Sequence, residues 1–314
     1  MSDFDVVVVG AGPGGLAAGC AAARAGCSVL ILEQGHEIGS PTRTTGGSFV
    51  QDLRDLDIPS RLYHPIRRCR FVSPRNSAAF DYGQPALCVI DVRGVFQFLA
   101  ERAAEAGAKI RMGAAAIEPI LENEFTAGVK TKTRTGADLT IRSKILIDAT
   151  GYRAAMLKQA GLHPGFYRFG VGSEYDLYAP HCNEDEAVLI VGRQIAPAGY
   201  AWVFPWGRKR VRVGVGIIHG DSKEHPDQYL DGFVERSAQF GVNLAGAQPI
   251  EYHYGLIPSD GLAKVFTGNG IMGVGDAAGQ SSALAGEGIR WAIKAGRMAG
   301  AVAGKAIAAR DVSQ

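Results

Sequence analysis

The hydrophobic pattern at the start of the chain predicts a strand, a turn, a helix and a second strand. Residues 5–9 are a β-branched run of the length of a buried parallel strand. A glycine-rich turn follows, residues 16–25 are rich in the helix former alanine, and residues 28–33 form another apolar run. This order predicts a βαβ unit, which implies a parallel sheet covered by helices.

Later segments separate into two kinds of pattern. Residues 95–106 have helical periodicity, and residues 145–151 form a buried strand that ends in a turn. Residues 165–258 have a different pattern, which is typical of strands. Within them, apolar residues from 211 to 217 alternate with polar residues or glycine, as in a half-exposed strand. Residues 188–191 and 200–204 also resemble strands, and a helix at 226–240 interrupts them.

The predicted fold class is therefore α/β. We expect a Rossmann-like domain with a parallel sheet and an inserted, mostly antiparallel β-sheet domain. The first domain is expected to be discontinuous and to comprise residues 1–60, 86–160 and 263–314. The second is expected to comprise residues 61–85 and 161–262 and to receive the substrate or partner.

Composition excludes several classes of protein. Hydrophobic residues make up 46% and charged residues 20%, which excludes a disordered chain. The net charge of +2 is too balanced for a nucleic-acid binder that works by bulk charge. The 42 glycines are nearly twice the usual share of about 7%, so we expect backbone packed closely against backbone or ligand.

The remaining composition favours a cytoplasmic protein without a metal site. The five cysteines form no CxxC pair, and the seven histidines show no metal-ligand spacing. Asp3 and Asp5 stand where a signal peptide has lysines, and Pro13 would break a membrane-spanning helix. The predicted last helix carries Lys294 and Arg297, which are costly in lipid, so we expect at most peripheral membrane contact.

The first turn carries a dinucleotide-binding motif in the required context. Gly10, Gly12 and Gly15 fit GxGxxG between a strand and a helix, where pyrophosphate meets the helix N-terminus. Glu33 ends the second strand and can accept hydrogen bonds from a ribose, whereas its charge would repel the 2′-phosphate of NADP. A second match at residues 268–273 precedes a strand and opens no helix, so we interpret it as coincidence.

A second motif near the C-terminus indicates which dinucleotide binds. Residues 275–279 and 286–289, read as GDAAG and GEGI, resemble the second flavin motif of hydroxylase-type, glutathione-reductase-like flavoproteins. This resemblance implies that Asp276 binds a ribityl hydroxyl of FAD. It also implies that the amides around Gly288 and Ile289 face the pyrimidine edge of the flavin, where they suit the charge of reduced flavin.

Two more segments are similar to that family. Arg93, Phe96 and Leu99 match its R-x-x-F-x-x-L helix, whose arginine contacts the cofactor, and residues 148–151 match its D-A-T-G strand end. The resemblance implies FAD as the cofactor. The cofactor contacts it implies are Gly10, Gly12, Pro13, Gly14, Gly15, Glu33, Gln34, Arg43, Arg93, Ala116, Gly275, Asp276, Gly286, Glu287, Gly288 and Ile289.

A narrower resemblance covers nearly the whole chain. Residues 200–205 resemble the Y-x-W-x-F-P motif of geranylgeranyl reductases, a family that hydrogenates isoprenoid double bonds with FAD. Strand alternation places Tyr200, Trp202 and Phe204 on one face as an aromatic wall, which would line a lipid-like substrate. The other interpretation is that these three aromatics belong to the core of the sheet.

The sequence departs from this family in three places. Many members have a cysteine near the flavin where this chain has Thr44 and Thr45, so the thiol is missing as a proton donor. These two threonines are candidate substrate-pocket residues. Ala283 stands where the family usually has proline, and the chain stops soon after the flavin helix, which puts the prenyl substrate in doubt.

Three functions follow as hypotheses, and the first two remain open. The first is an oxidoreductase that hydrogenates a carbon–carbon double bond of a prenyl or other hydrophobic substrate. The second is a flavoprotein that passes electrons from NAD(P)H or ferredoxin to a redox partner protein; the basic runs at 67–70 and 208–210 would suit an acidic partner. The third, a monooxygenase or halogenase, is disfavoured because Tyr200 and Phe204 replace residues of the halogenase W-x-W-x-I-P segment.

Overall fold

The computed structural model describes residues 2–282 and 285–314, and contacts between Cα atoms divide the chain into two compact units. Unit 1 comprises Met1–Ser40, Phe96–Tyr167 and Pro258–Gln314, and unit 2 comprises Pro41–Val95 and Arg168–Ile257. The α/β class predicted from the sequence is confirmed. Within the described residues, no helix has both the length and the apolar character needed to cross a membrane.

Unit 1 is built on a mainly parallel sheet with the order β17-β18-β11-β1-β2-β8. The β1 strand pairs in parallel with β2 and β11, and its residues Val6–Val8 are fully buried, as their β-branched run predicts. An antiparallel extension, β9 and β10, continues from β11. The strands are β1 (Phe4–Val9), β2 (Val29–Leu32), β8 (Lys109–Arg111), β9 (Ala114–Glu122), β10 (Phe125–Thr133), β11 (Asp138–Asp148), β17 (Thr267–Gly268) and β18 (Ile271–Gly273).

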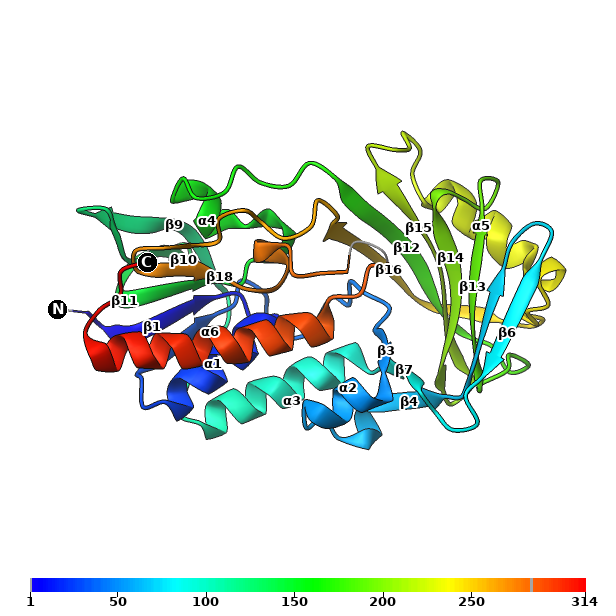
Figure 1. Ribbon diagram of the computed structural model, residues 1–314, viewed down its shortest axis with the longest axis horizontal. Helices are drawn as coiled ribbons and strands as arrows, with labels where there is room; N and C mark the ends of the chain where they lie inside the picture. Colours follow the sequence, from blue (N-terminus) through cyan, green and yellow to red (C-terminus); the bar gives the residue numbers. More distant parts are fainter. Residues whose placement is uncertain (1, 283–284) are drawn as a thin grey trace. The chain divides into compact units, whose positions relative to one another are not determined.

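The helices of unit 1 explain much of the glycine content. Figure 1 shows α1 and α6 side by side, in blue and red. Their backbones touch through glycines one turn apart on α6: a Cβ on Gly296 or Gly300 would lie 2.2 Å from a carbonyl oxygen of α1. The helical elements are α1 (Pro13–Arg24), α4 (Ala155–Gln159), α6 (Ile289–Ala309), η2 (Gly151–Arg153) and η4 (Gly275–Ala278); α3 (Val92–Glu105) begins in unit 2 and ends in unit 1.

Unit 2 contains a seven-stranded sheet in the order β16-β12-β15-β14-β13-β5-β6. Among the described strands, β13 and β5 pair in parallel, whereas β12, β14 and β6 pair antiparallel with their neighbours β15, β13 and β5. The expected mostly antiparallel sheet is thus present. Its strands are β5 (Arg68–Val72), β6 (Ser77–Asp81), β12 (Phe169–Tyr178), β13 (Glu186–Gly192), β14 (Ala196–Gly207), β15 (Arg210–His219) and β16 (Gln248–Pro258). The helix expected at 226–240 is shorter, α5 (Asp227–Glu235), and the short helix η3 (Ser237–Phe240) follows it.

The β15 strand differs from the half-exposed strand expected at this position. Val211, Val213 and Val215 are fully buried on one face, against the residues of α5. On the other face Arg212 is only 4% exposed, and Gly214 lies beneath the Trp202 ring. Period-two alternation therefore identified the strand correctly, but the polar residues on its second face are covered as well.

A small antiparallel sheet places two segments in unit 2 that the sequence suggested for the first domain. Its order is β3-β7-β4, and β7 pairs with both β3 and β4. These hydrogen bonds tie residues 41–60 and 86–95 to residues 61–85, so the expected boundaries are displaced there. The elements are β3 (Gly47–Phe49), α2 (Val50–Asp55), η1 (Ser60–Leu62), β4 (Tyr63–Ile66) and β7 (Leu87–Ile90).

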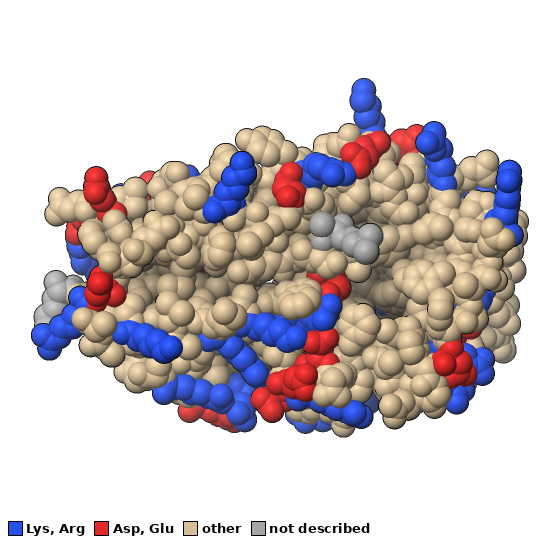
Figure 2. Space-filling view, in the orientation of Figure 1, with Lys and Arg blue, Asp and Glu red and all other residues tan. Residues whose placement is uncertain are grey.

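Acidic and basic side chains are mixed on the surface. On the face shown in Figure 2, blue and red side chains lie beside one another in several places on a largely uncharged surface. This mixture agrees with the net charge of +2.

Candidate functional site

Two glycines, one in the turn after β1 and one in the first turn of α1, are required by the packing of the chain itself. Gly10 has φ +108°, and a Cβ there would lie 2.3 Å from the carbonyl oxygen of Ala149. A Cβ on Gly15 would lie 2.1 Å from the carbonyl oxygen of Gly10. Strand and helix can approach this closely only without side chains at these positions.

Gly12 is different, because its surroundings in the described residues do not require a glycine. Its φ of −74° is ordinary, and a Cβ built on it would meet no atom of residues 2–282 and 285–314 within 4 Å, its two chain neighbours aside. This open space lies at the N-terminus of α1, which has no side-chain cap and no acidic residue in its first turn. A helix N-terminus with this free space fits the pyrophosphate of a dinucleotide.

Glu33 stabilises the same turn through hydrogen bonds. Its carboxylate accepts hydrogen bonds from the N–H groups of Ala11, at 2.9 Å, and Gly35, at 2.7 Å. The side chain is half-buried at the end of β2, so acceptor capacity remains for a ribose hydroxyl. Gln34, the next residue, is exposed. Ala116 is half-buried on β9. The start of β9 is held next to Glu33, because the Ala114 N–H donates a hydrogen bond to the Glu33 carbonyl oxygen.

The segment with the second flavin motif lies next to the glycine turn. A Cβ on Gly14 would be 3.5 Å from the N atom of Gly275, and a Cβ on Gly288 would be 3.4 Å from Asp276 Oδ1. Gly288 is the N-cap of α6 and provides no side-chain hydrogen bond to its amides. The structure thus brings together two uncapped helix N-termini and one carboxyl group, with Gly275 and Gly286 at positive φ in the connecting turns.

Asp276 carries a carboxyl group that lacks a donor. Among residues 2–282 and 285–314, no hydrogen bond to its side chain is recorded. Burial raises its pKa to about 6. A half-buried carboxyl without a partner fits a ribityl hydroxyl of FAD, which would donate a hydrogen bond to it.

Glu287 of the second flavin motif and Asp148 of the D-A-T-G segment stabilise the local structure through hydrogen bonds. The Glu287 carboxylate accepts hydrogen bonds from the side chains of Arg290 and Trp291, in the first turn of α6. Asp148 is fully buried and accepts hydrogen bonds from the N–H groups of Thr150, Met156 and Leu157, which fixes the turn after β11. Burial raises the pKa of Asp148, and these hydrogen bonds oppose that rise.

Other features expected from the sequence are not part of unit 1, lie outside the described residues or have a different structure. Arg43 and Arg93 are exposed residues of unit 2, and their contacts with FAD stay predictions. Ala283 lies outside the described residues. The second GxGxxG match is a hairpin, in which β17 pairs antiparallel with β18, so its interpretation as coincidence is confirmed.

The pKa of Asp276 gives a test of its role. Protonation below pH 6 removes the charged acceptor, so FAD affinity should fall as the pH is lowered from 7 to 5. Asp276→Asn should weaken FAD binding by about 1.5–3 kcal/mol, roughly ten- to hundredfold, and should flatten this pH dependence. Fluorescence titration of the apoprotein with FAD measures both effects. Equal affinities of wild type and variant at pH 7 would show that Asp276 does not hold the cofactor.

The aromatic residues on β14 have three different environments. Trp202 is 8% exposed, and its indole ring covers Gly172, Gly214 and Gly216 of the neighbouring strands. The Tyr200 ring is half-buried, 5.7 Å from the ring of Trp202 and tilted by 60°. Phe204 packs against Gly47 and the cluster around Ile66 and Val89. That these rings line a substrate stays a prediction.

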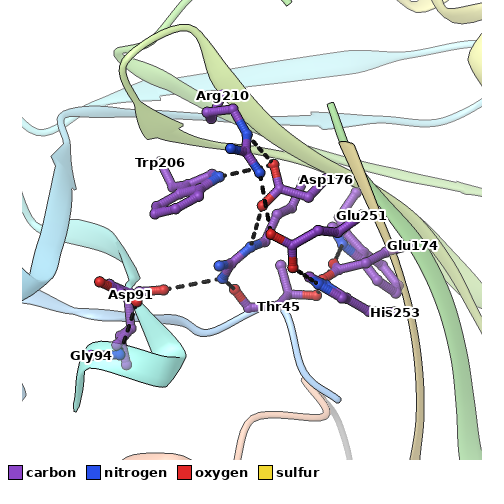
Figure 3. A network of polar contacts seen from close by, with 12 residues as sticks. Thr45, Asp91, Gly94, Glu174, Asp176, Trp206, Arg210, Glu251 and His253 are labelled. Carbon is purple, nitrogen blue, oxygen red and sulfur yellow. Dashed lines mark hydrogen bonds and ion pairs between the residues drawn. The ribbon is translucent and has the colours of Figure 1, made fainter. Parts of the chain in front are cut away.

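Thr44 and Thr45 precede β3 and are both half-buried. The Thr45 hydroxyl donates a hydrogen bond of 2.5 Å to Glu174 Oε2 (Figure 3), which also accepts one of 2.9 Å from Trp202 Nε1. The sequence analysis missed Glu174. The sequence feature that could have indicated it is a carboxylate at an interior position of a strand in which the adjacent residues are apolar or small.

Comparison with known proteins identifies the family. The model of FAD-dependent oxidoreductases matches residues 5–174, and the geranylgeranyl reductase catalytic domain matches residues 170–256. Digeranylgeranylglycerophospholipid reductase of Methanosarcina acetivorans is 33% identical over 99% of this chain and 77% of that protein. Digeranylgeranylglycerophospholipid reductase 2 of Methanococcoides burtonii is 34% identical, with the same coverage.

Solved structures agree with this result. A geranylgeranyl bacteriochlorophyll reductase-like protein of Thermoplasma acidophilum has a TM-score of 0.92 and 30% identity, over 99% of this chain and 80% of that one. A flavin-dependent brominase has a TM-score of 0.79 at 20% identity, over 98% and 80% of the two chains, which shows a shared fold alone. FAD is thus the cofactor, and the chain belongs to the geranylgeranyl reductase family of FAD-dependent oxidoreductases.

Proposed function

We propose that this chain uses reduced FAD to saturate carbon–carbon double bonds in the prenyl chains of a lipid-like substrate. The observation that carries the proposal is the match of the geranylgeranyl reductase catalytic domain to residues 170–256, which include β12 to β16 of unit 2. The relatives named as digeranylgeranylglycerophospholipid reductases support a prenyl lipid as the substrate class. Reduced FAD supplies the hydride for such a reaction.

The residues of the chain have separate tasks in this proposal. In unit 1 the open space at Gly12, the Glu33 carboxylate and the Asp276 carboxyl, which has no hydrogen-bond partner within the described residues, bind the cofactor. In unit 2 the adjacent rings of Tyr200 and Trp202, tilted by 60° to each other, offer apolar contacts to a prenyl chain. Aromatic contact would hold the prenyl chain and exclude water from it.

Product analysis tests this proposal. The protein, loaded with FAD and kept reduced by dithionite without oxygen, is incubated with a digeranylgeranylglycerophospholipid. We expect mass spectrometry to show lipid products that gain two hydrogen atoms for each double bond reduced. A lipid that remains unchanged, with a reduced flavin that an electron-accepting protein reoxidises, would instead support the electron-transfer function.

The electron donor is proposed to be NAD(P)H or a reduced ferredoxin. Anaerobic titration of the FAD-loaded protein with NADH, NADPH and reduced ferredoxin distinguishes these donors, because only a competent donor bleaches the flavin absorbance within the turnover time. Bleaching by dithionite but by none of the three would contradict the proposed donor classes.

A further inference from the structure

The last helix of unit 1, α6, carries basic side chains and no acidic ones. Its 21 residues include Arg290, Lys294, Arg297 and Lys305, and the α1 helix packed beside it adds Arg24. These two helices therefore hold five of the 33 Lys and Arg residues of the chain and none of the 31 Asp and Glu residues. The other residues have 28 Lys and Arg against 31 Asp and Glu, a net charge of −3, so positive charge is concentrated on this helix pair.

Helical periodicity gives the outward face of α6 two adjacent stripes. The apolar stripe recurs at intervals of seven and four residues and consists of the exposed side chains of Trp291, Met298 and Val302. The basic stripe starts three residues after the tryptophan and consists of Lys294, Arg297 and Lys305. The opposite face, with the glycines described above, packs on α1. In Figure 2, blue side chains recur along the line that α6 follows in Figure 1.

Trp291 is held in one orientation by its neighbours. Its Nε1–H donates a hydrogen bond of 2.9 Å to Glu287 Oε1, and the same carboxylate accepts hydrogen bonds from Arg290. Arg290 Cζ and Lys294 Nζ lie 4.3 and 5.1 Å from the centroid of the indole ring, within the range of cation–π attraction. The ring is nevertheless 40% exposed. A fixed, exposed tryptophan beside an arginine has the composition of the few residues that dominate the energy of protein–protein binding.

The same turn of α6 adjoins the proposed flavin site. Gly288 is the N-cap of α6, and a Cβ there would lie 3.4 Å from Asp276 Oδ1. Trp291 follows Gly288 by three residues, so the exposed ring and the amides proposed to face the flavin belong to one helical turn. Both lie in unit 1. A protein bound on this face would therefore contact the helical turn that begins at the group to be reduced.

We propose that the outward face of α6 binds a small acidic protein that carries one electron at a time and reduces the FAD of this chain. The inference rests on the proposed function, in which FAD has to be reduced again after each turnover, and it selects a protein donor over NAD(P)H. The step oxidises two carriers by one electron each and takes one proton from solvent, which balances the two-electron reduction of FAD to FADH−.

An anionic membrane surface is the other partner that a basic helix could meet. Interfacial helices bury a broad apolar face in lipid, whereas the broad apolar face of α6 is already packed on α1. The Trp291 ring lies beside two cations, and its N–H is bonded to a carboxylate that would have to leave water with the ring. The arrangement therefore favours an acidic protein, whose carboxylates can pair with the basic stripe around a contact centred on Trp291.

Flavin reduction by two donors tests the proposal. A plant-type [2Fe–2S] ferredoxin, a small acidic protein, is reduced, freed of excess reductant and mixed anaerobically with the FAD-loaded protein. Reduced methyl viologen, a small cation that needs no docking surface, is the comparison donor. Lys294→Gln/Arg297→Gln should slow reduction by ferredoxin at low salt by about tenfold or more, because charge steering raises association rates by factors of about 10 to 1,000. Reduction by methyl viologen should not become slower.

Lys132→Gln/Arg134→Gln is the matched control, because it removes the same charge from exposed positions of unit 1, at and just after the end of β10. It should leave reduction by ferredoxin unchanged. Trp291→Ala should raise the ferredoxin concentration that gives half the maximal rate by about tenfold or more, without loss of FAD. Equal ferredoxin rates in wild type and Lys294→Gln/Arg297→Gln, or no reduction of wild type by ferredoxin, would overturn the docking surface.

Binding without electron transfer gives a second readout. Calorimetric titration of the FAD-loaded protein with oxidised ferredoxin should show a complex that weakens with salt and in the α6 variants, and cytochrome c, a basic one-electron carrier, should not bind. If Lys294→Gln/Arg297→Gln loses binding to phosphatidylglycerol vesicles but binds ferredoxin normally, α6 contacts a membrane and the proposal is wrong.

Failure of the docking surface and failure of the proposed function are distinguishable. The α6 variants, reduced by dithionite, should hydrogenate the prenyl lipid as fast as wild type does, because dithionite needs no carrier. An α6 face that does not bind ferredoxin therefore leaves the proposed function intact. A prenyl lipid that dithionite-reduced wild type leaves unchanged contradicts the proposed function, whatever binds to α6.

Discussion

Gly12→Val should abolish FAD binding and leave the protein folded. The φ of −74° at this position suits valine, and a Cβ there lies more than 4 Å from every described residue other than its chain neighbours. The isopropyl group would instead fill the space at the α1 N-terminus where we propose that pyrophosphate binds. We expect at least a hundredfold weaker FAD binding, measured by fluorescence titration, with an apoprotein melting temperature within a few degrees of wild type.

Gly15→Ala is the matched control for this prediction. Its Cβ would lie 2.1 Å from the carbonyl oxygen of Gly10, so the strand and helix would have to separate. This variant should lower the melting temperature of the apoprotein, which Gly12→Val should not. Normal flavin content in Gly12→Val would place the pyrophosphate elsewhere.

Trp202→Ala should destabilise unit 2 by about 3–5 kcal/mol, the usual cost of truncating a buried tryptophan. The ring is 8% exposed and covers three glycines, so its removal leaves a cavity above positions that carry no side chain of their own. Glu174 also loses a hydrogen bond. Urea unfolding, followed by circular dichroism, measures the free-energy change.

Trp202→Phe separates the two contributions of this residue. It keeps an aromatic ring over the glycines but removes the indole N–H, so we expect a loss of about 1.5–3 kcal/mol, the cost of a hydrogen bond to a charged group. If Trp202→Ala unfolded at the same urea concentration as wild type, the indole would not be packed on the sheet. FAD affinity in unit 1 should be unchanged in both variants at low temperature.

The sequence predicted the features that depend on nearby residues. The β1–α1–β2 unit and its glycine turn follow from an apolar run, three glycines and an alanine-rich segment that are contiguous in the chain. The role expected of Asp276 came instead from the resemblance of a short motif before the last helix to a flavoprotein family, and it stays a prediction. The β1–α1–β2 unit itself is determined by local propensity and by backbone conformation, which a single sequence shows directly.

Features that depend on distant pairing could not be predicted. Glu174 and His253 are 79 positions apart and meet only because β12 and β16 are neighbours in the sheet. The burial of Arg212 depends in the same way on Asp176 across the sheet. The displaced segments 41–60 and 86–95 follow from the pairing of β3 with β7. Periodicity identifies a strand, but the order of strands decides which polar groups become buried together.

A single-turnover measurement tests the central claim, that reduced FAD hydrogenates a prenyl double bond. FAD-loaded protein is reduced without oxygen, freed of excess reductant and mixed with the prenyl lipid, and flavin absorbance and lipid mass are measured in the same sample. We predict that one double bond is saturated for each flavin that becomes oxidised. A flavin that stays reduced in the presence of the lipid, or that is oxidised while the lipid mass remains unchanged, would contradict the claim.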